Sequence, residues 1–499
     1  MSIAAVLALP GGVFPGGTGS HSSTLVAHTD KGAVAGVRDQ GVDSFLGIRY
    51  AAPPVGNLRW RPPQPAAPWP GVAPATSYGN RCAAAASTNG PRTEAEDCLF
   101  VNVQRPTGVR AGDHRPVYVF IHGGGLVNGS SNQADMAAVV RQTGVIGVSF
   151  NYRLGVLGFL GLAGLTAEGG ESGNYGFQDQ QAALRWIQRN VAAFGGDPRR
   201  VTVGGESAGG WSVCGHLVAP GSRGLFAQAM MQSGSCTTRT RAQAEASGAA
   251  LESAVGCADV ACLRRTSVSA LIDAPQGSFG LVRGTPTLPA DPAVAVASGR
   301  FARVPIVIGS NRDEGRTFAQ GFIGQTEAQY VAYVTTTYGA AVLAHYPWPA
   351  GADQFTAAYL VGAIMTDSGA VGGIGGCADR RLTHSLARWT RVYAYEFDHR
   401  TGPGLTPIPG YVWGAGHAAE LAYLFPSFDN GTPIAPTFNA AERRLARDMK
   451  AAWARFASSG TPGWPSHGFY SLRAGGHSRL ISDAEFAAEH QCSFWDSQV

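Results

Sequence analysis

The sequence predicts an α/β fold, in which a central, twisted and mostly parallel sheet carries helices on both faces. Two observations predict it. Short runs rich in β-branched residues alternate with helical stretches, and no internal repeat or low-complexity block appears after residue 24. Strands are expected at 117–121, 144–151, 201–204, 226–232, 304–309 and 392–397, with a helix at 178–191. Such sheets bind ligands beyond the carboxyl ends of their strands, so we expect the functional side chains in the loops that follow these strands.

Composition predicts one large folded unit. The chain has 499 residues, of which 44% are hydrophobic and 14% charged, so a large core is possible. Its Gly- and Pro-rich stretches do not divide it, and we predict a single domain over residues 25–499. Residues 317–416 are expected to form helices over the strand ends. Residues 1–24 form either a disordered leader or the remnant of a secretion signal that lacks the usual basic start.

Charge and cysteine usage bound the partners. A net charge of +4 is too small for a nucleic-acid surface, and no run of 18 apolar residues predicts a membrane span. No grouping of Cys and His has zinc-ligand spacing, so we expect no metal or cofactor and a small molecule as partner. The even count of eight cysteines favours disulfides and an oxidising, extracytoplasmic compartment, with buried free thiols as the alternative.

The strand expected at 201–204 runs directly into Gly205-Glu206-Ser207-Ala208-Gly209. A strand that enters a helix through Gly-x-Ser-x-Gly makes a sharp turn with the serine at its tip, and the glycines leave room for that bend. The following helix directs its positive end at any anion formed there. This arrangement is suited to attack on a carbonyl, and Ser207 is the predicted nucleophile.

Three other segments offer the parts that a serine nucleophile needs. Glycines 123–125 follow the strand at 117–121, and their backbone N–H groups, with that of Ala208, could bind an oxyanion. The strand at 304–309 leads to Asp313 and Glu314, between which composition alone does not choose the acid. The candidate base is His417, on a loop late in the chain. His216 is expected to pack within a helix, and His122 to support the glycine loop.

These segments resemble the type-B carboxylesterase/lipase family of α/β hydrolases, which includes cholinesterases and bacterial carboxylesterases. The likeness runs from about residue 25 to the end. Its motifs include Phe-Leu-Gly-Ile-Arg-Tyr-Ala at 45–51, Glu-Asp-Cys-Leu-Phe-Val-Asn-Val at 96–103, Asn-Tyr-Arg at 151–153 and Phe-Gly-Gly-Asp-Pro at 194–198. The resemblance implies the α/β-hydrolase fold and Glu314 as the acid, with His417 as the base. It places the oxyanion site at Gly124, Gly125 and Ala208, and it implies ion pairs of Arg59 with Glu96 and of Arg153 with Asp179.

The resemblance also implies disulfides. It pairs Cys82 with Cys98 and Cys377 with Cys492. Cys262 matches a family cysteine whose usual partner would be Cys257, although the spacing is shorter than usual. If these two pair, Cys214 and Cys236 form the fourth bridge, and a rearranged set among the four is the alternative. Trp211 stands where the family usually has a small residue, so it either narrows the pocket or packs in the core.

The sequence as a whole predicts a serine hydrolase that cleaves carboxylic esters through an acyl-enzyme intermediate. Two rivals follow from the same residues. An acyltransferase or cyclising enzyme would use the same triad with another acceptor. A non-catalytic binding protein would resemble the adhesion members of the family, which have lost the serine. No acidic and aromatic gorge for a cationic alcohol is evident, which argues against a cholinesterase.

Overall fold

A large mixed sheet organises the part of the chain that the computed structural model describes, residues 25–275, 277–405, 408–428 and 433–498. The expected leader at 1–24 lies outside these residues. Within them the sheet has 11 strands, and β8, β7, β9, β10, β13, β14 and β15 run parallel. In sheet order the strands are β16 (Arg479–Ile481), β15 (Phe469–Leu472), β14 (Val392–Phe397), β13 (Ile306–Asn311), β10 (Gln228–Gln232), β9 (Gly196–Glu206), β7 (Arg115–Ile121), β8 (Ile146–Phe150), β6 (Phe100–Pro106), β4 (Val42–Arg49) and β3 (Val37–Asp39).

The six strands expected from the sequence are β7, β8, β9, β10, β13 and β14, and each is confirmed. Three start two residues later than expected, and β13, which begins at Ile306, is one of them. Gly144 has φ of +78° and ends helix α1 (Ala137–Thr143), so β8 begins at Ile146. The expected strand at 226–232 is β10, which begins at Gln228. Smaller sheets pair β1 (Val26–Thr29), β2 (Gly32–Ala35) and β5 (Val72–Pro74), and β11 (Arg239–Thr240) with β12 (Val282–Arg283).

Alternate residues of the central strands face two apolar clusters. On β7, Val117, Val119 and Ile121 pack into the cluster that holds α4 (Tyr175–Asn190) and α5 (Ala208–Val218). Tyr118 and Phe120 pack into the cluster that holds α1 and α14 (Ala440–Ser459). This is the two-residue period of a strand that is buried on both faces. The sheet is therefore covered on both sides, as the expected α/β architecture requires.

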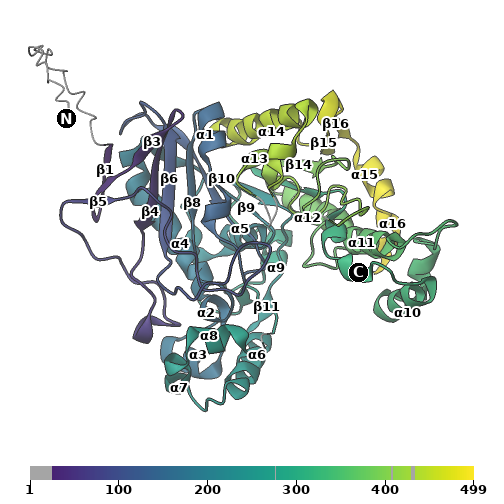
Figure 1. The fold of residues 1–499 in the computed structure, drawn as a ribbon, viewed down its shortest axis with the longest axis horizontal. Helices are drawn as coiled ribbons and strands as arrows, with labels where there is room; N and C mark the ends of the chain where they lie inside the picture. The colour runs from purple at the N-terminus through teal and green to yellow at the C-terminus, as the bar shows by residue number, and fades with distance from the viewer. Residues whose placement is uncertain (1–24, 276, 406–407, 429–432, 499) are drawn as a thin grey trace, which may run out of the picture.

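Helices lie on both sides of the sheet (Figure 1). One cluster includes α4 (Tyr175–Asn190), α5 (Ala208–Val218) and α9 (Pro292–Ala297), and the other includes α11 (Thr356–Ser368), α13 (Leu421–Leu424) and α14 (Ala440–Ser459). Helix α14 is bounded by clear signals. Asn439 and Glu442 form a reciprocal capping box at its start, and Gly460, at φ of +73°, ends it.

A separate group of helices lies at the lower end of the molecule in Figure 1. Leucine and valine side chains from these helices share one cluster, which also contains Trp60 and Tyr175. Its helices are α2 (Gly155–Phe159), α3 (Ala163–Gly169), α6 (Arg241–Ala254), α7 (Val260–Arg265) and α8 (Val268–Asp273).

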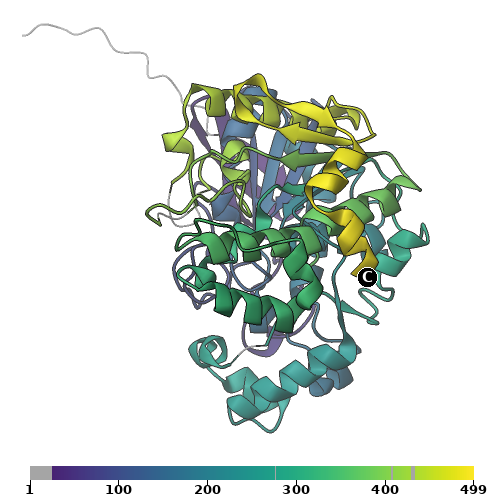
Figure 2. The ribbon, with the colours of Figure 1, turned by 90° about the vertical axis from the view of Figure 1, so that its right-hand side faces the viewer.

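The segment 317–416 contains helices, as expected, before β14 begins at Val392. They are α10 (Glu327–Tyr338), α11 and α12 (Gly376–Ala387). The C-terminal helices α15 (Asp483–Glu489) and α16 (Cys492–Trp495) run beside α11 and α12, and Figure 2 shows this yellow segment against the green helices. No helix among the described residues is both long and apolar enough to span a bilayer.

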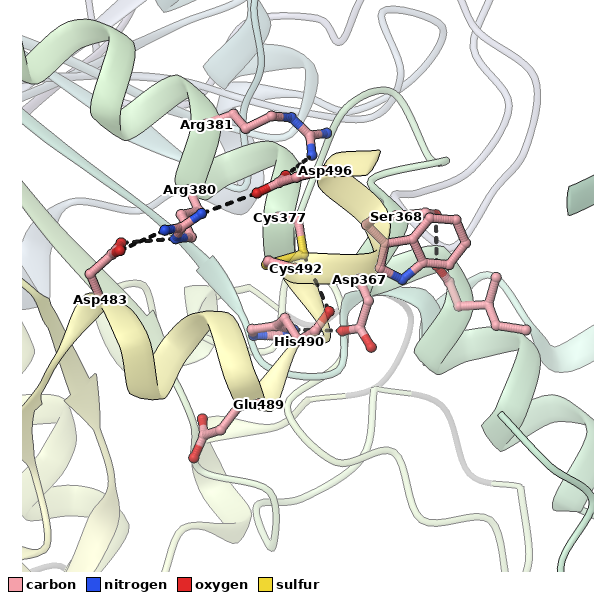
Figure 3. The surroundings of a disulfide bond; sticks show 12 residues. Asp367, Ser368, Cys377, Arg380, Arg381, Asp483, Glu489, His490, Cys492 and Asp496 are labelled. Carbon is pink, nitrogen blue, oxygen red and sulfur yellow. Dashed lines mark hydrogen bonds and ion pairs between the residues drawn. A yellow bond between two sulfur atoms is a disulfide. The ribbon is translucent and has the colours of Figure 1, made fainter. Parts of the chain in front are cut away.

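The structure joins all eight cysteines in four disulfides. The pairs are Cys82–Cys98, Cys214–Cys236, Cys257–Cys262 and Cys377–Cys492. Cys257 thus pairs with Cys262 despite the short separation, and the rearranged set does not occur. The bridge from Cys377 to Cys492 ties α16 to α12. Beside it His490 Nδ1 lies 2.6 Å from Asp367 Oδ1. Figure 3 shows these two side chains next to the bridge.

Both ion pairs that the resemblance implies are present. The Arg59 guanidinium donates two hydrogen bonds to Glu96, at 2.6 and 2.7 Å. Arg153 does the same to the fully buried Asp179, with both contacts at 2.7 Å. Removing one member of such a buried pair leaves an uncompensated charge, which typically costs about 3–5 kcal/mol.

Candidate active site

Ser207 sits in a strained turn between β9 and α5. Its φ of 57° and ψ of −122° place a residue with a β carbon in a region that such residues rarely occupy. The flanking glycines make the turn possible. A β carbon on Gly205 would lie 2.5 Å from the carbonyl carbon of Gly209, and one on Gly209 would lie 2.1 Å from the Ile121 oxygen. The motif therefore folds as its sequence predicts.

Glu314 and His417 lie in direct contact. Glu314 begins a single 3₁₀ turn just after β13, and its Oε2 is 2.6 Å from His417 Nδ1. Its other oxygen, Oε1, accepts hydrogen bonds from the Asn311 backbone N–H at 2.7 Å and from the Ser233 hydroxyl at 2.5 Å. These three contacts fix the carboxylate against the imidazole.

Asp313, the other acid that composition allowed, lies elsewhere. Its carboxylate accepts two hydrogen bonds from Arg400, at 2.7 and 2.8 Å, and one from the Ala415 backbone N–H at 3.0 Å. Burial opposes its charge, but these partners outweigh burial and keep the pKa of Asp313 below its usual value. The aspartate thus holds the loop before His417 and does not contact the imidazole.

A second carboxyl group, that of Glu206, lies at the other nitrogen of the ring. Glu206 Oε1 is 3.2 Å from His417 Nε2, and the side chain is buried. Burial raises the pKa of Glu206 to about 8. Burial also acts against the imidazolium, but the charges of Glu206 and Glu314 outweigh it and raise the pKa of His417 to about 9. The sequence analysis assigns no role to Glu206, although its acidic side chain directly precedes the predicted nucleophile.

Asn311 and Glu420 support the loops that carry the acid and the base. The Asn311 side-chain amide donates to Glu420 Oε2 at 2.7 Å and to the Gly416 carbonyl at 2.8 Å, next to His417. Burial raises the pKa of Glu420 to about 7. Neither residue was predicted, because their contacts form only when β13 and the late histidine loop come together.

The glycine loop after β7 packs against the serine turn. A β carbon on Gly123 would lie 2.7 Å from Glu206 Oε2 and 3.0 Å from the Ser207 β carbon. Gly124 and Gly125 have φ of +99° and +63°, in the region that favours glycine. Within the described ranges, the N–H groups of Gly124, Gly125 and Ala208 donate to no protein acceptor. They stay available for a ligand.

His216 and His122 have the structural roles that the sequence analysis expects. His216 is buried in α5, with its ring nitrogens 2.8 Å from Ser222 Oγ and 3.1 Å from Gln180 Oε1. His122 stacks on Tyr152, and its Nδ1 lies 3.0 Å from the Gly123 carbonyl oxygen. Burial lowers the pKa of His122 to about 4, so this ring is neutral at pH 7.

A cavity of about 330 Å³ opens onto these groups, and Ser207, His417, Glu206 and the three glycines all line it. Trp211 also lines it, and its ring crowds Gly372, where a β carbon would lie 2.4 Å from Cζ2. Trp211 also packs against the apolar cluster that holds α4 and α5, so both expectations for Trp211 hold. Apart from Trp211, the apolar lining includes Phe318, Val371, Ile374, Leu421 and Phe425.

A model of the carboxylesterase family matches residues 23–471, which is most of the chain. The chain belongs to the carboxylesterase family. Its relatives include a fumonisin B1 esterase of Sphingopyxis macrogoltabida, 35% identical over 472 residues, covering 89% of this chain and 84% of that one. Human cocaine esterase is 33% identical over 491 residues, covering 89% and 85% of the two chains.

Solved structures agree with this membership. A thermophilic PNB esterase superposes with a TM-score of 0.78 and 29% identity, covering 94% of this chain and all of that one. The carboxylesterase chain described here therefore has the α/β-hydrolase fold, and it is a carboxylic ester hydrolase. In the described part of this carboxylesterase, no group of three or more His, Cys, Asp or Glu residues is placed to hold a metal ion.

Proposed function

We propose that this carboxylesterase cleaves esters of small molecules through a covalent acyl-enzyme, with Ser207 as nucleophile, His417 as base and Glu314 as the acid that orients the base. The observation that carries the proposal is the 2.6 Å contact between His417 Nδ1 and Glu314 Oε2, beside the strained Ser207 on the same cavity. A carboxylate at Nδ1 holds a proton there and leaves Nε2 free to accept one.

In the acylation step, the Ser207 oxygen bonds to the ester carbonyl carbon while its proton passes to His417 Nε2. The carbonyl oxygen becomes an anion, which the N–H groups of Gly124, Gly125 and Ala208 bind. The carbon–oxygen bond to the alcohol then breaks, and the alcohol leaves with the proton from Nε2. Glu314 stabilises the imidazolium that exists between these two proton transfers.

Deacylation repeats this sequence with water. Water bonds to the acyl carbon as His417 takes its proton, and the bond to Ser207 breaks as the serine oxygen regains a proton from His417. The products are a carboxylic acid and free enzyme. We also propose that the protein works in an oxidising compartment outside the cytoplasm, which the four disulfides support.

Substitution of the three side chains tests the mechanism with a short p-nitrophenyl ester. We expect Ser207→Ala and His417→Ala each to lower kcat by at least about 10³-fold, and Glu314→Gln to lower it by about 10⁴-fold, because the base loses its orientation. His384→Ala, whose exposed ring pairs with Asp483, is the matched control and should turn over normally. Turnover like that of wild type in Ser207→Ala would end the proposal.

A further inference from the structure

Two walls of different chemistry line the cavity beside Ser207. From the apolar lining residues, we call Trp211, Val371 and Ile374 the apolar wall. Opposite chemistry is found on the loop 82–98 and on the segment that follows β7. Val127 and Ala134 are apolar, but other lining side chains there carry amide, hydroxyl or imidazole groups. We use the name polar wall for five of them: Asn89, His122, Asn128, Ser130 and Gln133.

Two buried atoms of the polar wall have no protein partner among the described residues. They are the hydroxyl oxygen of Ser130, which is 0% exposed, and the Nε2 atom of His122. Because the Gly123 carbonyl can only accept, the proton of the neutral His122 ring sits on Nδ1, and Nε2 is an acceptor. A buried polar atom left unpaired costs about 1–3 kcal/mol, so each needs an explanation. Both residues line the cavity, where a bound ligand could supply hydrogen-bond partners.

The amides of the polar wall are held in place by one another. Asn89 donates to Asn128 Oδ1 at 2.7 Å, and Gln133 donates to Asn89 Oδ1 at 3.3 Å. These bonds leave the Asn128 side-chain NH₂ and the Gln133 side-chain carbonyl without a partner in the described part of the chain. The wall therefore presents both a donor and an acceptor from side chains whose positions are already fixed.

The polar wall carries no charge. Among the residues that the structure describes, no Lys or Arg lines the cavity, and the ionisable lining residues are Glu206, His417 and the neutral His122. An anion against this wall would lose its water without gaining an opposite charge, which is costly. A cation would meet Glu206, which is already paired with His417. A neutral group such as a hydroxyl or an amide would lose water and regain hydrogen bonds.

The orientation of His417 indicates which part of an ester meets this wall. Its Nε2 is 3.2 Å from Glu206 Oε1, and Glu206 Oε2 lies against Gly123, from which the polar wall continues. The leaving alcohol has to take its proton from Nε2, so its oxygen lies beside Glu206, next to the glycine that begins the segment carrying most of the polar wall. The acyl group is then left to the apolar wall, where Trp211 restricts its size.

We propose that the polar wall is a subsite for the alcohol part of the ester, and that it selects alcohols bearing a neutral hydroxyl or amide a few atoms from the ester oxygen. This subsite rests on the proposed function, because it assumes that His417 protonates the leaving alcohol. It assigns the substrate class as esters that join a small apolar acyl group to a polar, uncharged alcohol.

A series of acetates tests the subsite. Each ω-hydroxyalkyl acetate, from 2-hydroxyethyl to 5-hydroxypentyl, is compared with the n-alkyl acetate of equal length, and kcat/KM is measured by acid release. If the subsite were apolar, kcat/KM would be higher for the n-alkyl acetate, because burying a hydroxyl without a hydrogen-bond partner is unfavourable. We expect the hydroxyl ester to be favoured by at least about five-fold at one length.

Variants connect this preference to the polar wall. Ser130→Ala removes a hydroxyl that has no partner in the structure, and Gln133→Leu removes an acceptor. Each should reduce the hydroxyl-to-methyl ratio by at least about three-fold. Ser131→Ala is the matched control, because this neighbouring buried serine accepts from Asn102 and does not line the cavity. We expect Ser131→Ala to keep the hydroxyl-to-methyl ratio of the wild-type enzyme.

The outcomes separate the two proposals. If wild type cleaves neither series, the proposed function fails. If it cleaves the n-alkyl acetates but favours no hydroxyl ester at any length, the subsite is wrong while ester hydrolysis stands. A preference that survives both Ser130→Ala and Gln133→Leu would also overturn the subsite.

Discussion

At the scale of single residues, the carboxyl of Glu206 stands next to the imidazole that the proposed mechanism uses as its base. Burial raises the pKa of Glu206, and the paired charges raise the pKa of His417 to about 9 despite burial. A base works only in its neutral form. Because its raised pKa keeps His417 protonated to higher pH than an ordinary histidine, the rate falls as the pH drops through that pKa.

Glu206→Gln tests this coupling. The amide removes a negative charge beside Nε2, so the pKa of His417 should fall, and the acid limb of kcat/KM should move to lower pH by about one unit or more. The measurement is the pH profile of kcat/KM for p-nitrophenyl acetate. Glu171→Gln, at a carboxylate outside the cavity lining, should leave the limb unmoved. If the acid limb of Glu206→Gln stays at the same pH or moves to higher pH, the coupling is refuted.

At the scale of elements, the active serine depends on how closely α5 approaches β7. Gly209, in the first turn of α5, lies where a β carbon would come within 2.1 Å of the Ile121 carbonyl oxygen at the end of β7. The same turn carries Ser207 and the Ala208 N–H group. Movement of α5 would therefore displace the nucleophile and an oxyanion donor together.

Gly209→Ala is expected to lower kcat by about 10²-fold or more and to reduce stability, because the helix must move away from β7. The kinetic assay and the midpoint of urea unfolding measure the two effects. Gly169→Ala is the matched control, since this helical glycine in α3 has no atom within 4 Å of an added β carbon. If Gly209→Ala kept full activity, the close approach would not matter.

The sequence predicted the parallel centre of the sheet because its strands are buried, β-branched runs followed by informative loops. It did not predict β3, whose three residues are all exposed, or β16, which is mostly exposed, since short edge strands carry no apolar pattern. Residue types could identify Ser207 and the glycine loop. They could not place Glu206 against His417 or Trp211 against Gly372, because those contacts depend on packing between distant segments.

At the scale of the whole molecule, the C-terminal helices are fastened to the segment that precedes β14. The Cys377–Cys492 bridge spans 115 residues, and nearby the buried His490 contacts Asp367 at 2.6 Å and Glu396 at 2.7 Å. The Arg380 side chain adds an ion pair to Asp483, at 2.6 Å. Together these contacts fix the end of the chain to α11 and α12. The interpretation of residues 25–499 as one domain stays a prediction.

Removal of individual disulfides tests how much the Cys377–Cys492 bridge contributes to the free energy of unfolding. In the chain-entropy model a loop of this length contributes about 4–5 kcal/mol, whereas the five-residue span of Cys257–Cys262 contributes about 2 kcal/mol. The double variant Cys377→Ala/Cys492→Ala should therefore unfold at lower urea concentration than Cys257→Ala/Cys262→Ala. The reverse order would contradict the proposed role of the long bridge.

The most direct test of the central claim is to trap the acyl-enzyme and locate the acyl group. The protein is quenched in acid during turnover of a short p-nitrophenyl ester, digested, and analysed by mass spectrometry. We predict that the acyl group lies on Ser207 and that Ser207→Ala gains no acyl group. An acyl group on another residue, or full turnover by Ser207→Ala, would contradict the proposed mechanism.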